Sequence, residues 1–270
     1  MNDFDDALYG LPSEVKVETR GPVRLVTLNR PDDLNGANRA MHQALAGLWH
    51  LLGEDTEARA VILTGSGQAF SAGGDFGYMQ QNVDDEAMRA QTMAEGRAII
   101  EGMVRCRLPV IAAVNGPAVG LGCSLAVLSD IVLMGEGSFL ADPHLRMGLV
   151  PGDGGMTWPM LTSLSRAKEY LFLGSRIPAA DAVSMGLASR VVAPEKLLDE
   201  ALALALRLAD VPATALQTTK RALNAYLDQQ LDNAYAIALS GELDSMHSKE
   251  HRLAVAAARS KAAAAGSRQG

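Results

Sequence analysis

The stretch Pro109–Gly155 constrains the fold of this chain most, because it combines a strand-like run, a glycine-rich turn and an apolar helix start. Its first part, Val110–Val114, is apolar throughout, and the Asn-Gly-Pro sequence that follows is typical of a sharp turn. Gly120 and Gly122 then precede the apolar segment Cys123–Leu128. Glycines between a strand and a helix leave backbone N–H groups uncovered. This order predicts an α/β protein with hydrogen-bond donors at a strand-to-helix turn.

A second turn of the same kind occurs earlier in the chain. The strand-like segment Ala60–Thr64 is followed by Phe70–Asp75, which reads Phe-Ser-Ala-Gly-Gly-Asp. Backbone donors in such turns can bind an anion or a carbonyl oxygen that gains negative charge during a reaction. Two donor-rich turns, each after a buried strand, indicate an oxyanion hole assembled from separate segments.

Four motifs resemble the crotonase superfamily, the family of enoyl-CoA hydratases, isomerases and relatives. They occur in order and with suitable spacing, at Leu28–Asn38, Phe70–Asp75, Ala112–Ile131 and Gly148–Gly155. The resemblance covers about residues 14 to 225. It implies an α/β crotonase (ClpP-like) spiral of ββα repeats with a C-terminal helical trimerisation region, and a homotrimer or a hexamer as the assembly. It also implies an acyl-CoA substrate, as in fatty acid metabolism, and no cofactor apart from the coenzyme A of the substrate.

The local patterns agree with such a repeat. Val15–Glu18 and Val23–Leu28 predict a hairpin-like strand pair, and Asn38 is expected to cap the next helix. The apolar positions of that helix fall at helical spacing, at Met41, Leu45, Leu48, Trp49 and Leu52. We expect an N-terminal tail (1–13), a spiral core (14–195), a helical oligomerisation region (196–258) and a C-terminal tail (259–270).

Composition narrows the partners and the location. The net charge of −7 argues against nucleic acid or an anionic membrane surface as the main partner. Two cysteines in apolar surroundings, Cys106 and Cys123, are expected to be reduced. The acidic start of the sequence is unlike a secretory signal, and a turn interrupts the apolar stretch around 108–134, so no membrane span is expected there. We therefore expect a cytoplasmic protein.

The resemblance assigns the oxyanion hole to the backbone N–H groups of Ala72 and Leu121. Gly73, Gly74, Asp75 and Gly120 are then expected to contact the substrate. A dinucleotide-binding interpretation of Gly120 and Gly122 fails, because Leu125 occupies the third glycine position of that fingerprint. A phosphate-binding P-loop fails as well, since no Gly-Lys-Ser/Thr occurs.

The acid–base groups depart from the hydratase pattern. Hydratases carry glutamates where this chain has Ser124 and His144. Hydration needs one group to activate water and another to handle the incoming proton, so the standard two-glutamate reaction is in question. His144 is the best remaining base. We expect Asp142 to cap a helix beginning at Pro143, whose positive end would lower the pKa of His144. Asp153 is expected to hold the Nδ1–H of His144.

Three functional hypotheses follow. The first is an enoyl-CoA hydratase/isomerase-type enzyme in which His144 and Asp153 replace the two glutamates, with Ser124 as a substrate contact of little catalytic weight. The second is a β-diketone C–C bond hydrolase, because the sequence around His144 and Asp153 resembles 6-oxocamphor-hydrolase-like enzymes and Glu242 resembles a further site carboxylate of that branch. The third is a non-catalytic binding protein that keeps the fold.

Other charged groups have simpler interpretations. His247 and His251 have the i, i+4 spacing of some metal sites, but no third ligand accompanies them, and we expect no metal. Lys220, Arg221 and Arg252 are candidate diphosphate contacts only by analogy with the family, and surface charge is the default interpretation.

Overall fold

A six-stranded sheet carries the fold, and the computed structural model describes residues 9–266. Its strands are β1 (Val15–Arg20), β2 (Val23–Leu28), β3 (Ala60–Gly65), β4 (Val110–Val114), β6 (Ile131–Gly135) and β9 (Arg190–Val192), adjacent in that order. β1 and β2 form the antiparallel hairpin that the sequence predicts, and the other neighbours run parallel. A smaller sheet contains β5 (Ala118–Val119), β7 (Phe139–Ala141) and β8 (Ile177–Pro178).

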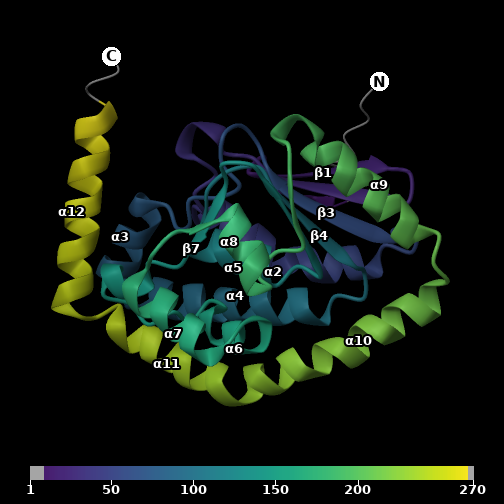
Figure 1. The fold of residues 1–270 in the computed structure, drawn as a ribbon. Coiled ribbons are helices and arrows are strands. Elements are labelled where there is room, and N and C mark those ends of the chain that lie inside the picture. The colour runs from purple at the N-terminus through teal and green to yellow at the C-terminus, as the bar shows by residue number, and fades with distance from the viewer. Residues whose placement is uncertain (1–8, 267–270) are drawn as a thin grey trace.

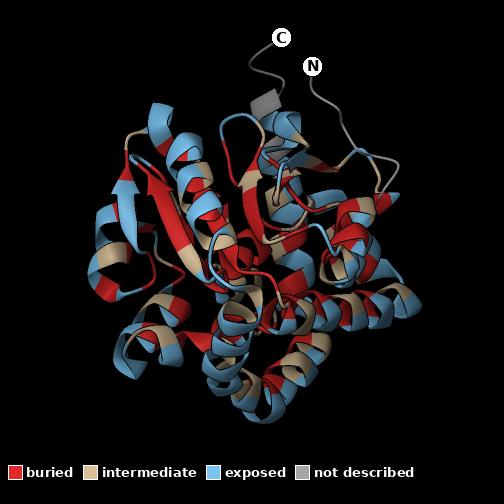
Figure 2. Cartoon of the chain, turned by 90° about the vertical axis from the view of Figure 1, so that its right-hand side faces the viewer, coloured by how far each residue is buried: buried red, intermediate tan, exposed pale blue. Residues whose placement is uncertain are grey.

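The central strands are apolar on both sides because both faces of the large sheet are covered. On one face, Ile62 and Ile111 pack against Ala201 and Ala205 of helix α9 (Leu197–Ala209). On the other face, Leu63 and Ala112 belong to the main core that helices α2 (Arg39–Glu54) and α4 (Glu86–Arg105) complete. Figure 2 shows buried residues concentrated on the strands and on the inner faces of the helices.

Each turn of the chain passes through both sheet layers before it enters a helix. After β3, Ser71 pairs with Ala118 of the small sheet, and after β2, Ala37 pairs with Gly74. The pairs β4–β5 and β6–β7 repeat this order. The predicted α/β spiral of ββα repeats is therefore confirmed, and its second layer carries both glycine turns.

The predicted helix after Asn38 is confirmed in detail. Asn38 caps α2 by accepting a hydrogen bond of 2.9 Å from the Met41 N–H. All five of its predicted apolar positions are buried. Helix α3 (Phe76–Asp84), which the sequence interpretation did not include, follows the first glycine turn, and α5 (Leu121–Val127) follows the second. These two helices extend from the turns that were expected to form the oxyanion hole.

The remaining helices surround this core. Three follow the glycine-rich segment near residue 150, namely α6 (Trp158–Leu161), α7 (Leu164–Leu173) and α8 (Ala179–Met185). Short 3-10 turns span Pro31–Asp33, His144–Met147, Gly155–Thr157 and Pro194–Lys196.

The C-terminal region runs around the outside of the molecule (Figure 1). It contains α10 (Ala213–Gln230), a π-helical turn (Leu231–Tyr235), α11 (Ala236–Ser245) and α12 (Lys249–Gly266). Helix α12 continues to Gly266, so the helical region extends past the expected boundary at residue 258, and 267–270 lie outside the described residues. No helix within 9–266 has both the length and the apolar character needed to cross a membrane.

Candidate active site

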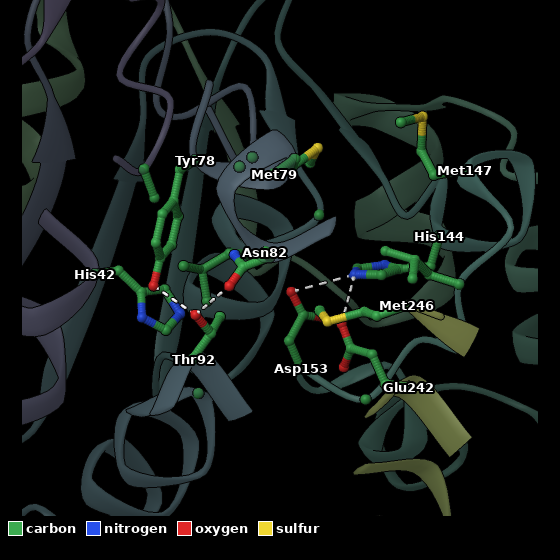
Figure 3. A pocket seen from close by; sticks show the side chains of 18 of the residues that line it. His42, Tyr78, Met79, Asn82, Thr92, His144, Met147, Asp153, Glu242 and Met246 are labelled. Carbon is green, nitrogen blue, oxygen red and sulfur yellow. Dashed lines mark hydrogen bonds and ion pairs between the residues drawn. The ribbon is translucent and has the colours of Figure 1, made fainter. Parts of the chain in front are cut away.

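A cavity of about 250 Å³ lies where the glycine turns meet α3, α4 and α11. Residues from both turns line it, together with His144, Asp153 and Glu242 (Figure 3). Gly73, Gly74 and Gly120 are also in this lining. The residues that the sequence places far apart therefore meet at one site.

The two turns touch through their glycines. Gly73 has φ +93°, and a Cβ there would lie 3.0 Å from the Val119 carbonyl oxygen. Gly120 has φ +52°, and its Cβ would lie 3.8 Å from the Gly73 Cα and from the His144 Cε1. Both positions have a positive φ that favours glycine, and at Gly73 a side chain would also crowd the Val119 carbonyl. The turns thereby reach the same wall of the cavity, beside His144.

The expected assignment of the Ala72 N–H to the oxyanion hole is wrong. The Ala72 N–H donates a 2.9 Å hydrogen bond to the Leu34 carbonyl, so it is not available to a substrate. The bridge between this turn and Ala37 uses the Gly73 carbonyl and the Asp75 N–H. In an extended segment the intervening Gly74 N–H points the other way. Gly74 lines the cavity, and its N–H has no hydrogen-bond partner among the described residues.

The second expected donor, the Leu121 N–H, lies where it can reach a ligand in the cavity. Leu121 is the first residue of α5, so its N–H has no carbonyl four residues earlier to bond within the helix. Leu121 also lines the cavity, directly after Gly120. The donors available on this wall are therefore the amides of Gly74 and Leu121.

Asp75 has a structural role instead of the expected substrate contact. Its carboxylate caps α3 by accepting hydrogen bonds from the Gly77 and Tyr78 N–H groups. The other carboxylate oxygen lies 3.3 Å from the Arg30 guanidinium, and Asp75 does not belong to the cavity lining. An N-cap fixes the direction of α3 where it leaves the glycine turn.

His144 is held by Asp142, and the sequence-based expectation of Asp153 in this role is wrong. Nδ1 of His144 lies 2.5 Å from Asp142 Oδ1, which also accepts the His144 backbone N–H at 3.2 Å. A carboxylate can only accept, so Nδ1 carries the proton. Pro143 separates the two residues and precedes the 3-10 turn His144–Met147. Asp142 therefore fixes the ring orientation, and Nε2 faces the cavity.

Two further carboxylates face Nε2. Asp153 Oδ2 lies 3.6 Å from Nε2, and Glu242 Oε1 lies 3.9 Å from it (Figure 3). Ser124 donates a 3.1 Å hydrogen bond to the other oxygen of Asp153. Ser124 thus positions Asp153, a role the sequence interpretation did not assign to it. The site brings one imidazole and three carboxyl groups together.

The expected decrease in the His144 pKa is contradicted. Burial alone would lower the pKa of His144, but the charges of Asp142 and Asp153 and the hydrogen bond to Asp142 outweigh it and raise that pKa well above its usual value. The expected helix dipole is weak because the turn has only four residues. The imidazole is therefore cationic at neutral pH, and its charge keeps the pKa of Asp142 low despite burial.

The pKa values of Asp153 and Glu242 are raised, in contrast to that of Asp142. Burial, the largest effect, raises the pKa of Asp153, and the charge of Asp142 adds to it. Burial likewise raises the pKa of Glu242 to about 8, with further increases from Asp153 and Asp142. At neutral pH Glu242 is thus a neutral carboxylic acid beside an imidazolium ion. Pairs of carboxyl groups with displaced pKa values are a recurrent feature of acid–base catalysis.

The sequence interpretation missed several of these residues. It assigned Asp142 only to a helix cap, although its spacing of two from His144 could have suggested the pair. His42, Tyr78, Asn82 and Thr92 also line the cavity. They lie on three different helices, and no spacing in the sequence links them to His144.

The metal and diphosphate candidates lie elsewhere or have other partners. His251 Nδ1 lies 2.8 Å from the Met147 carbonyl oxygen. Ligand atoms of Asp142, His144 and Asp153 lie within 4.8 Å of one another, but Nδ1 of His144 already donates to Asp142. Lys220 is buried and pairs with Asp130 at 2.7 Å, which contradicts the default of a surface charge.

Comparison with known proteins finds relatives of a single family. Residues 18–260 match the family described as "Enoyl-CoA hydratase/isomerase". A "Probable enoyl-CoA hydratase, mitochondrial" of Dictyostelium discoideum is 35% identical over 77% of this chain and 74% of its own length. A "Probable enoyl-CoA hydratase" of Rhizobium meliloti is 35% identical over 80% of this chain and 82% of its own.

A solved structure gives the same result. An enoyl-CoA hydratase/isomerase from Mycobacterium paratuberculosis superposes with a TM-score of 0.89 and 48% identity, covering 91% of this chain and 98% of that one. With the spiral of ββα repeats and the paired glycine turns, these matches show that the chain belongs to the enoyl-CoA hydratase/isomerase family of the crotonase superfamily and is an enzyme of that family.

Proposed function

We propose that this enzyme adds water to an enoyl-CoA thioester, or shifts its double bond, with Asp153 and Glu242 as the acid–base pair and His144 as the charge between them. The observation that supports this proposal best is the cluster of His144, Asp153 and Glu242 in the same cavity as the free amides of Gly74 and Leu121. The two amides would hold the thioester oxygen while negative charge develops on it.

The proposal changes the role first given to His144. A cationic imidazole cannot accept a proton, so the base must be a carboxylate. Asp153 and Glu242 come from different elements than the usual hydratase glutamates, yet they supply two carboxyl groups at one point. Glu242, neutral near pH 7, can donate a proton, and Asp153 can accept one in its carboxylate form.

The gaps around Nε2 suit a water molecule. Separations of 3.6 Å and 3.9 Å are too long for direct hydrogen bonds, and a water can bridge groups at such distances. In hydration, the water oxygen bonds to C3 of the enoyl group while Asp153 takes its proton. Glu242 gives its proton to C2, so H and OH add across the double bond. In isomerisation, the same groups remove a proton from one carbon and return it to another.

Turnover of crotonyl-CoA and a 3-enoyl-CoA tests this function. Asp153→Asn and Glu242→Gln should each lower kcat by about 10²–10⁴-fold, the usual contribution of general acid–base catalysis. Asp244→Asn is the matched control, because Asp244 lies on α11 with Glu242 but is exposed. Absence of wild-type turnover on every enoyl-CoA would refute the proposal, as would unchanged rates in both variants.

One observation keeps the β-diketone hydrolase as a second candidate. Glu242 lies beside His144 and Asp153 in the cavity, as the resemblance to that branch suggested. There the water oxygen would bond to a ketone carbon, the adjacent C–C bond would break, and the amides would hold the enolate until it is protonated. Turnover of a cyclic β-diketone without measurable coenzyme A affinity would favour this candidate. The non-catalytic hypothesis has no comparable support, because the acid–base groups are present.

The reaction we propose needs only proton transfers and water. We therefore assign no cofactor apart from the coenzyme A of the substrate. A cytoplasmic location and a homotrimeric or hexameric assembly remain predictions that accompany this function.

A further inference from the structure

The wall of the cavity opposite His144 is polar. Figure 3 shows His42, Tyr78, Asn82 and Thr92 on one side of the cavity, and His144, Asp153 and Glu242 on the other. The first group comes from three helices, α2, α3 and α4. A few converging polar groups in a largely apolar pocket ordinarily fix the orientation of a ligand. None of these four residues has a part in the proposed proton transfers.

The hydrogen bonds within this polar wall have a defined direction. Thr92 Oγ1 donates to Asn82 Oδ1 at 2.8 Å, which uses its only proton. The Tyr78 hydroxyl, 2.6 Å from Thr92 Oγ1, must therefore be the donor of that bond. The Asn82 side chain also forms a hydrogen bond with Tyr78, yet an amide nitrogen carries two protons. One N–H of Asn82 is left without an acceptor among residues 9–266, and Asn82 is only 4% exposed.

His42 contributes a ring nitrogen without a partner among the described residues. Its Nδ1 lies 2.9 Å from Glu95 Oε2, and because a carboxylate only accepts, Nδ1 carries the proton. The other ring nitrogen, Nε2, is then left to meet a ligand. That nitrogen has no hydrogen-bond partner in the described part of the chain, although His42 is only 7% exposed and lines the cavity. Because His42 lines the cavity, a ligand or a water molecule there can meet this nitrogen.

The charges around this wall select against an anionic ligand. No lysine or arginine occurs among the described residues that line the cavity. The Glu95 carboxylate lies directly behind His42, so a second carboxylate there would be repelled. The complementary group is neutral, forms a hydrogen bond with His42 Nε2 and accepts one from the Asn82 amide. A hydroxyl group does both.

We propose that His42 and Asn82 form a subsite for a hydroxyl group on the acyl part of the substrate, away from the reacting carbons. This inference rests on the proposed function only in naming an acyl-CoA as the carrier of that hydroxyl. Tyr78 and Thr92 hold Asn82 in place, and Glu95 holds His42. If the polar wall served only to join α2, α3 and α4, its removal would alter stability and leave ligand preference unchanged.

Calorimetric binding of two saturated, unreactive ligands tests the subsite. The wild-type enzyme should bind 6-hydroxyhexanoyl-CoA about tenfold more tightly than hexanoyl-CoA, the contribution typical of a net hydrogen bond. His42→Phe and Asn82→Leu keep the side-chain size and remove the polar atoms. Each should reduce this ratio to about one. His50→Phe is the matched control, because His50 lies on α2 but is exposed and outside the cavity.

The results separate this inference from the proposed function. A wild-type ratio near one, no measurable binding of the hydroxylated ligand, or a ratio that both variants retain would overturn the subsite. Thermal unfolding shows whether each variant is folded, and Asn82→Leu decides if His42→Phe is not. A hydroxyl preference lost in the variants, with no turnover of any enoyl-CoA, would support the subsite and refute the hydration proposal. Turnover of an enoyl-CoA without any hydroxyl preference would support the hydration proposal and refute the subsite.

Discussion

Asp142 and His144 are two residues apart, and their side chains form the shortest polar contact in the active site. Because Pro143 lies between them, the backbone has little freedom to separate them. The contact keeps the imidazole charged and leaves Nε2 as its only free nitrogen. The chemistry of the site therefore depends on a residue that contacts neither the proposed water nor the substrate.

Asp142→Asn tests this dependence. The amide can present either its oxygen or its nitrogen to Nδ1, and it carries no charge, so the His144 pKa should fall. We expect kcat to decrease by about 10²–10⁴-fold, the upper value being that of the aspartate of a serine-protease triad. The titration of His144 followed by NMR should move to lower pH. An unchanged His144 titration would show that Asp142 does not set the charge of the ring.

Glu242 provides a second test at the scale of one residue. Its pKa is about 8 in the folded protein against an ordinary value of 4.5, so the native chain holds a proton that the unfolded chain has lost between these values. The free energy of unfolding should therefore decrease as pH rises from 4.5 to 8, by about 2–5 kcal/mol from this group. Glu242→Gln should flatten that decrease in urea titrations. The raised pKa of His144 acts in the same direction, so some slope should remain.

At the scale of elements, the start of α5 positions the Leu121 amide. Gly122 packs against the turn that follows β3, and a Cβ at this position would lie 2.6 Å from the Ser71 carbonyl oxygen and 2.7 Å from the Ser71 Cβ. The helix can approach this turn only because residue 122 has no side chain. This contact is thus one of those that set the distance between the two donor turns.

Gly122→Ala should push α5 away from the Ser71 segment. We expect a loss of about 1–3 kcal/mol in unfolding free energy, as for overpacking in a core. The kcat should fall by about 10²–10³-fold if the Leu121 amide is displaced. Gly47→Ala is the control, since Gly47 lies within α2 and a Cβ there would meet nothing within 4 Å, and it should stabilise the protein slightly. A fully active Gly122→Ala variant would contradict this role of the contact.

At the scale of the whole molecule, the C-terminal helices expose apolar side chains. Leu223 and Tyr226 on α10 are each 63% exposed, and Ile237 on α11 is 77% exposed. The large sheet is already covered on both faces, so these side chains have no place in the core of this chain. Exposed apolar groups on neighbouring helices are typical of a subunit interface.

We therefore expect a trimer or a hexamer in solution. Light scattering at micromolar concentration should report three or six times the mass of one chain, which is 28.5 kDa. Ile237→Asp should lower that mass while circular dichroism stays unchanged, because the side chain is exposed within one subunit. A stable wild-type monomer would contradict the expectation.

The repeat and the location of the glycine turns could be predicted from the sequence without the fold. Apolar runs such as Val110–Val114, and glycines at positions that need a left-handed backbone, act locally and can be recognised as they stand. The capping of α2 by Asn38 is local in the same way. The position of His144 in the site was also predictable, because it lies in a motif that the family resemblance aligns.

The partners of these groups, in contrast, depended on the tertiary structure. Ala72 lost its expected role because Leu34, which is distant in sequence, accepts its N–H. The pKa of His144 rises instead of falling because Asp153 and Glu242, from other segments, join the neighbouring Asp142 around the ring. His42 faces the same cavity because α2 packs beside α4. Hydrogen bonding and electrostatic effects depend on distances in space, and these distances are set by the packing of segments far apart in the chain.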